Sequence, residues 1–160
     1  MSNLSPLTHQ SLVRLQGEID NLHRGGSKSE PKPHKLIMLL VVIEMADRGM
    51  LQENKIYYDE ALRKIFNDYF QLVSGLDDWP QPGPPFFHLR TSDFWHHKIK
   101  DGQEAHYSML TTSGGGNKRI EDNIEYAYLS DYAYHVISNV ATREILRNYI
   151  SALVNPNQSL

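Results

Sequence analysis

The stretch that decides the fold reads Pro31-Lys32-Pro33-His34-Lys35-Leu36-Ile37-Met38-Leu39-Leu40-Val41-Val42-Ile43. Its last eight residues are all apolar, so a helix that contains them has no polar face and must be surrounded by other segments. The sequence therefore predicts a buried central helix. We expect it to begin near Pro33 and to end near Asp47, Arg48 and Gly49, with the glycine as its C-terminal stop.

The start of this helix is basic, because Lys32, His34 and Lys35 cluster there. Backbone N–H groups at a helix N-terminus are unpaired and the helix dipole is positive, and Pro33 suits the first turn because its missing N–H costs nothing there. Such an end attracts anions, so we expect a phosphate site at this position. A solvated helix start without a ligand is the alternative.

The composition limits the class of protein. The chain has 160 residues, no cysteine and a net charge of -3 with its eight histidines counted neutral. This length predicts one domain over residues 1–160, with its core between about 5 and 154. Disulfides and thiolate metal sites are excluded, and the sequence shows neither a membrane span nor a signal peptide, which predicts a cytoplasmic protein. The acidic balance restricts a nucleic-acid surface to a local patch.

Further helices are predicted from apolar spacing that repeats on one face. They are expected over residues 5–24, 60–72, 131–138 and 140–154. Asp59, Ser130 and Asn139 stand where a side chain can cap the last three of these helices.

Strands are predicted where aromatic and β-branched residues gather between turn signals. They are expected over residues 55–58, 86–90, 94–99 and 105–112, with the second and third joined into a hairpin by 91–93. Prolines exclude regular structure over 79–85, and a glycine loop is expected over 113–119. The predicted fold class is therefore α+β: a mainly helical single domain around a buried central helix, with a small antiparallel β-sheet.

Two sets of side chains suggest other functions. His88, His96 and His97 lie near Asp93 in the sequence, which raises the alternative of a metal-dependent nuclease. Neighbours on one strand point to opposite faces, however, and the spacing of an HNH nuclease is missing, so we expect no metal site and no catalytic residue. Phosphate-loop and dinucleotide-binding motifs are also missing. A protein-interaction module is the other alternative, suggested by exposed tyrosines at Tyr126, Tyr128, Tyr132 and Tyr134.

Three motifs occur here in the order of a known family. They are Lys32-Pro33-His34-Lys35 before the apolar helix, Pro85-Phe86-Phe87-His88-Leu89-Arg90 followed by Phe94-Trp95, and a terminal amphipathic helix with Arg147-Asn148-Tyr149-Ile150. Over about residues 5–154 the chain resembles the sulfur-binding domain, which reads phosphorothioate-modified DNA and usually precedes an HNH nuclease in modification-dependent restriction endonucleases. The resemblance implies a noncatalytic recognition module of a type IV restriction system, without a cofactor. Its implied partners are phosphorothioate-modified double-stranded DNA and a fused or partner HNH nuclease.

The resemblance also implies the residues of the site. The phosphate and phosphorothioate contacts are expected from Lys32, His34, Lys35, His88, Arg90, Thr91 and Ser92, with Arg90 holding the modified phosphate. An apolar cavity for the sulfur is expected near the end of the last helix, lined by Tyr149, Ile150, Ser151 and Val154. Further DNA contacts, including contacts with base edges in the major groove, are expected from Arg24, Lys28, Asp93, Lys118 and Arg119.

Overall fold

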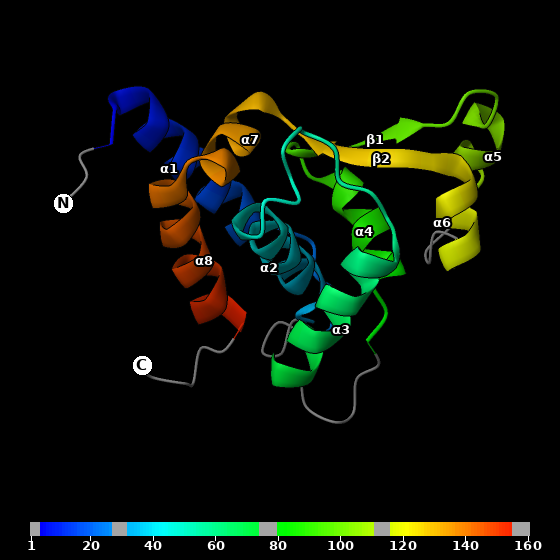
Figure 1. The fold of residues 1–160 in the computed structure, drawn as a ribbon, viewed down its shortest axis with the longest axis horizontal. Coiled ribbons are helices and arrows are strands. Elements are labelled where there is room, and N and C mark those ends of the chain that lie inside the picture. Colours follow the sequence, from blue (N-terminus) through cyan, green and yellow to red (C-terminus); the bar gives the residue numbers. More distant parts are fainter. Residues whose placement is uncertain (1–3, 27–31, 74–79, 111–115, 155–160) are drawn as a thin grey trace.

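A computed structural model describes residues 4–26, 32–73, 80–110 and 116–154 of the chain. Within these ranges the protein is mostly helical, with one two-stranded antiparallel sheet (Figure 1). The elements follow in the order α1 (Pro6–Asp20), α2 (His34–Asp47), α3 (Glu60–Val73), α4 (Gly83–His88), the 3-10 turn η1 (Leu89–Thr91), β1 (Trp95–Ile99), α5 (Glu104–Ser108), α6 (Asn117–Asn123), β2 (Ile124–Leu129), α7 (Asp131–Ser138) and α8 (Val140–Val154). The predicted α+β class is confirmed. None of the described helices is long and apolar enough to cross a membrane.

Helix α2 is the buried centre of the fold, as predicted. Each residue from Leu36 to Ile43 is at most 7% exposed. Helices α7 and α8 contact α2 on one side and α3 and α4 contact it on the other (Figure 1). The predicted stop is also confirmed: Gly49 adopts a φ of 74°, which lets its N–H and that of Met50 donate to carbonyls of the last turn at 3.1 and 2.9 Å.

Helices α3, α7 and α8 agree with the predicted ranges, whereas α1 ends at Asp20 rather than at the predicted Arg24, and two of the three predicted side-chain caps are present. Asp59 caps α3 through its Oδ1, which accepts from the N–H of Leu62 at 2.9 Å. Asn139 caps α8 in the same way, accepting from two N–H groups of the first turn at 2.9 and 3.2 Å. Ser130 occupies the N-cap position of α7 as predicted, but its side chain makes no capping bond, because its hydroxyl donates to the carbonyl of Asp93 at 2.8 Å.

The sheet pairs differently from the prediction. Residues 95–99 form β1, but the partner of β1 is β2, with Trp95 opposite Leu129 and His97 opposite Ala127. The predicted hairpin with residues 86–90 is therefore wrong. Residues 55–58 contribute a single bridge, Ile56 with Ala127, along the other edge of β2.

Residues 86–90 belong to α4 and η1 rather than to a strand. Phe86, Phe87 and Leu89 are all fully buried, and a short run of buried residues is compatible with either conformation. Pro84 and Pro85 fall in the first turn of α4, where a proline removes no intrahelical hydrogen bond. The prediction of irregular structure over 79–85 is thus wrong from Gly83 onward, and residue 79 lies outside the described residues.

Two further predictions fail beyond the sheet. The third strand expected over 105–112 is helical over Glu104–Ser108, which form α5, and residues 111 and 112 lie outside the described residues. Of the glycine loop expected over 113–119, residues 113–115 also lie outside the described residues, and 117–119 form the first turn of α6. Helices α5 and α6 lie together at the end of the sheet that is far from α1 (Figure 1).

Candidate anion-binding site

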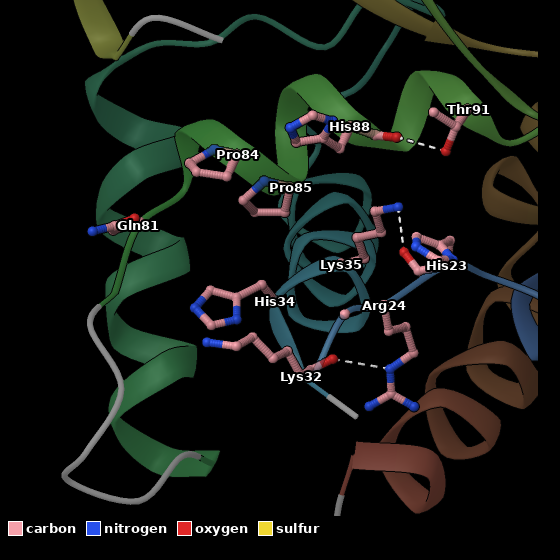
Figure 2. A pocket seen from close by; sticks show the side chains of 11 residues that line it. His23, Arg24, Lys32, His34, Lys35, Gln81, Pro84, Pro85, His88 and Thr91 are labelled. Carbon is pink, nitrogen blue, oxygen red and sulfur yellow. Dashed lines mark hydrogen bonds between the residues drawn. The ribbon is translucent and has the colours of Figure 1, made fainter. Parts of the chain in front are cut away.

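A pocket of about 400 Å³ lies between the start of α2 and helix α4 (Figure 2). Three segments form its walls: residues 23–25 after α1, residues 32–35 at the start of α2, and residues 81–91 in and around α4. The described residues that line it are His23, Arg24, Gly25, Lys32, His34, Lys35, Gln81, Pro84, Pro85, His88 and Thr91. The pocket thus joins two motifs that the sequence analysis treated as separate.

One side of the pocket is basic. Arg24, Lys32 and Lys35 carry formal positive charges there and His34 adds an imidazole ring, while His88 contributes a second imidazole from α4. No carboxylate is present among the lining residues that the structure describes. The pocket is therefore locally cationic although the whole chain has a net charge of -3.

Lys35 is the most enclosed of these cations, with only 9% of the residue exposed. Its Nζ donates to the carbonyl of His23 at 2.5 Å, which leaves two of its three N–H donors for a ligand. Burial lowers the pKa of Lys35 because the charged form loses hydration. A bound anion replaces that lost hydration, so the position of Lys35 favours a negatively charged ligand.

The segment after α1 is tied to the start of α2 by two hydrogen bonds. The Nε of Arg24 donates to the carbonyl of Lys32 at 2.9 Å, and the N–H of Lys32 donates to the carbonyl of Gly25 at 3.3 Å. Gly25 has a φ of 72°, a conformation that favours glycine. Burial lowers the pKa of Arg24 as well. These bonds hold the basic side in place before a ligand arrives.

The α4 side of the pocket has an apolar patch at Pro84 and Pro85. Figure 2 shows the rings of Pro84 and Pro85 on this side, across from His34 and Lys32. Neither ring carries a hydrogen-bond donor, and a proline has no backbone N–H. A ligand in the pocket therefore meets cations on one side and, at Pro84 and Pro85, a donor-free patch on the other, with the imidazole of His88 next to that patch.

The α4 helix is positioned by His97 of β1. In the neutral ring, Nε2 donates to the carbonyl of Phe86 at 3.0 Å and Nδ1 accepts from the hydroxyl of Tyr107 at 2.8 Å. The imidazole also stacks on the rings of Phe86 and Phe87. Burial lowers the pKa of His97 to about 4. His97 therefore stays neutral near pH 7 and acts as a structural tie rather than a catalytic base.

Arg90 does not line the pocket. Its side chain is exposed, and its guanidinium lies 4.0 Å from the ring centroid of Phe87 and 5.2 Å from that of Tyr107. Stacking on two rings restricts the side chain while its donors remain accessible. Arg90 is thus a fixed surface cation two residues from His88, which does line the pocket.

The helical segment that begins with α4 ends at Thr91 and Ser92, whose hydroxyls donate to carbonyls of its last turn. Thr91 donates to the carbonyl of His88 at 3.0 Å, and Ser92 donates to the carbonyl of Leu89 at 2.6 Å. Thr91 also lines a second cavity of about 350 Å³, together with His23, Ser92, Asp93 and residues near the end of α1. The two cavities share His23 and Thr91 as lining residues, so they are neighbours.

The four α8 residues predicted to line a sulfur cavity are not among the described residues of this pocket. Ile150 is fully buried in the core. The hydroxyl of Tyr149 donates to both carboxylate oxygens of Asp20 at 2.6 Å, which raises the pKa of Tyr149. Ser151 and Val154 are half-buried. The apolar part of the pocket comes instead from Pro84 and Pro85, which sequence reasoning assigned to a loop.

The remaining predicted DNA contacts are dispersed. Lys118 and Arg119 are exposed in the first turn of α6, and Arg119 borders a separate cavity of about 370 Å³ beside α5. Lys28 lies outside the described residues. His23 and Gln81 line the main pocket but were not predicted. His23 could have been predicted because it precedes Arg24 in the sequence, and Gln81 because it lies among the prolines before α4.

The histidines of the metal hypothesis do not converge. Both ring nitrogens of His97 are engaged within the protein, Nε2 of His96 lies 2.7 Å from the hydroxyl of Ser130, and His88 faces the pocket. In the part of the chain that the structure describes, no group of three or more His, Cys, Asp or Glu residues is arranged to hold a metal ion. The nuclease alternative therefore gains no support from these positions.

Comparisons with known proteins add no family assignment. The chain matches no protein-family model and no curated protein.

Proposed function

We propose that the pocket between α2 and α4 binds a phosphate of the DNA backbone in which sulfur replaces a non-bridging oxygen. The observation that carries this proposal is the meeting of three cations and two proline rings in one pocket. The resemblance to the sulfur-binding domain supports it, because two of the three shared motifs meet there. In this proposal the domain reads phosphorothioate-modified double-stranded DNA and does no chemistry, and an HNH nuclease would supply the cutting in a type IV restriction system.

The cations supply affinity rather than discrimination. Replacing a phosphate oxygen by sulfur keeps the negative charge, so Arg24, Lys32 and Lys35 attract both forms. Arg90 would hold a phosphate next to the pocket, because it is exposed and fixed by Phe87. Thr91, Ser92 and Asp93, on the adjoining hollow, would face the neighbouring bases.

The preference for sulfur would come from the proline side. Sulfur is larger and more polarisable than oxygen and a poorer hydrogen-bond acceptor. Contact with roughly 30 to 40 Å² of apolar surface at Pro84 and Pro85 would contribute about 1 kcal/mol. An oxygen in the same place would lose water without gaining a donor, at a cost of about 1 to 3 kcal/mol. Rejection of oxygen therefore carries most of the preference.

The experiment is a mobility-shift titration of two duplexes that differ by one sulfur atom. Wild-type protein should bind the modified duplex at least about 30-fold more tightly, the ratio that corresponds to 2 kcal/mol. Pro85→Ser adds a backbone N–H and a hydroxyl to the apolar side, so it should lower this ratio. Pro6→Ser, at the exposed first turn of α1, is the matched control and should leave the ratio unchanged.

Charge and selectivity are separated by a second pair of variants. Lys35→Met should weaken binding to both duplexes, whereas Lys64→Met, an exposed lysine of α3 outside the pocket, should change neither affinity. Arg90→Ala should also weaken both. Equal affinity of the wild type for the two duplexes would refute the proposal that the pocket recognises sulfur. An unchanged affinity in Lys35→Met would show that DNA does not enter the pocket.

A further inference from the structure

The outer face of the sheet carries a row of exposed and half-buried aromatic side chains that the proposed function does not use. Along β2, Ala127 and Leu129 are buried, so Tyr126 and Tyr128 point to the opposite face. The bridge between Ile56 and Ala127 brings Tyr57 beside Tyr126. We call the six side chains on this side the tyrosine face: Lys55, Tyr57, His96, Lys98, Tyr126 and Tyr128.

The rings of the tyrosine face form one continuous series. Ring centroids are 5.8 Å apart between Tyr57 and Tyr126, 6.2 Å between Tyr126 and Tyr128, and 5.2 Å between Tyr128 and His96. Tyr57 is 46% exposed and Tyr128 is 37% exposed. The tyrosine pairs meet edge to face, at interplanar angles of 64° for Tyr57 with Tyr126 and 66° for Tyr126 with Tyr128, so the rings face different ways and suit bases that are unstacked from one another.

Two lysines accompany the rings. The Nζ of Lys55 lies 5.3 Å from the ring centroid of Tyr126, and Lys98 is the cross-strand partner of Tyr126. Glu53 pairs with Lys55 at 3.5 Å, and Glu125 is exposed on β2 beside Tyr126. Lys55 and Lys98 therefore lie next to the tyrosine rings. The carboxylates of Glu53 and Glu125 are not among the six side chains of the face.

The tyrosine face is separate from the pocket between α2 and α4. The inward side chains Trp95 and His97 of β1 contact α4 through the carbonyl of Phe86. Figure 1 shows the sheet along one edge of the molecule, with α2, α3 and α4 below it. A ligand on the tyrosine face therefore does not occupy the pocket.

We propose that the tyrosine face binds single-stranded nucleic acid, with unpaired bases stacked on the tyrosine rings and phosphates beside Lys55 and Lys98. Aromatic rings accept any base because each base has a flat π face, and small sheets that present a few aromatic residues bind single strands in this way. A protein partner fits less well. Lysine is depleted at the core of protein interfaces, and two of the six side chains of this face are lysines.

The test uses a fluorescently labelled 12-nucleotide oligothymidine and anisotropy at low salt. The wild type should bind it, and the affinity should fall as salt is raised. Tyr128→Ala and Tyr126→Ala should each weaken binding by about 5- to 150-fold, the range for loss of one stacked base. Tyr128→Phe keeps the ring and should bind like the wild type, and thermal unfolding verifies that each variant is folded.

The outcome is independent of the pocket, because the tyrosine variants should leave binding of the phosphorothioate duplex unchanged. Failure of the wild type to bind the oligonucleotide would overturn the inference without affecting the pocket. Equal binding by the wild type and by folded Tyr128→Ala and Tyr126→Ala would also overturn it. If sedimentation showed that the same variants abolish self-association of the chain while oligonucleotide binding is absent, the face would be a protein contact and the inference would be wrong.

Discussion

Lowering the pH from 7 to 5 should destabilise this protein through His97. The folded protein keeps the ring neutral down to a pKa of about 4, because the ring is buried between Phe86, Phe87 and Tyr107. The unfolded chain takes up the proton near the ordinary value of 6.5. Between these two values the unfolded state binds the extra proton, so acid favours unfolding.

The size of the effect follows from the two pKa values. The stabilising effect of keeping His97 neutral is fully present above pH 6.5 and is lost as the pH falls toward 4. Linkage gives a total loss of about 3 kcal/mol, of which about 2 kcal/mol falls between pH 7 and pH 5. A loss of this size is a large fraction of the stability of an ordinary domain.

The assay is urea denaturation of the wild type and of His97→Gln at pH 7 and pH 5. Glutamine can still donate to the carbonyl of Phe86 but does not titrate. The variant will be less stable at pH 7, so the quantity compared is the change between the two pH values rather than the stability itself. The wild type should lose about 2 kcal/mol more than the variant.

Other groups titrate in both proteins, so their contributions cancel in this comparison. An equal loss in wild type and variant would refute the reasoning, because it would mean that His97 takes up its proton as readily in the folded protein as in the unfolded chain. Titration of the His97 ring protons by NMR measures the folded-state pKa of His97 directly. A folded-state pKa near 6.5 would contradict the burial argument.

Two further predictions concern helix ends. Arg143→Gln should lower the free energy of unfolding by about 2 to 3 kcal/mol, because the half-buried guanidinium donates to Asp47 at 2.7 Å and to the carbonyl of Ile137 at 2.9 Å. Chemical denaturation measures this loss, and an effect as small as that of the exposed Arg14→Gln control would refute it. Asn139→Ala should cost about 1 kcal/mol by removing the cap of α8. Asn139→Asp should retain most of the stability in thermal unfolding, and equal stability of all three proteins would show that the cap contributes nothing.

Several features of the fold followed from local sequence. Helix α2 was predictable because eight consecutive apolar residues allow no solvent-facing side, and its end was predictable because only glycine readily takes the left-handed conformation at Gly49. The limits of α8 were predictable because Asn139 is a good N-cap residue. In each case the decisive interaction lies within a few residues along the chain.

The strand pairing and α4 were not predictable in this way. The partner of β1 lies at 124–129, and nothing within residues 95–99 indicates which distant segment will pair with them. Phe86, Phe87 and Leu89 are buried in a helix, but their pattern suits a strand equally well. Burial against His97 and α2 selects the helix, and that contact exists only in the folded protein.

The candidate site also has one part that the sequence predicted and one part that depended on the tertiary structure. The sequence by itself determined that α2 is buried and that its start is basic, because charge and apolar runs are properties of the chain. Only the tertiary structure decided what stands opposite those cations. Packing of α4 against α2 places Pro84 and Pro85 there, while α8 directs Ile150 into the core and Tyr149 to Asp20. The facing side of a pocket depends on contacts between distant segments, and such contacts form only when the whole core is assembled.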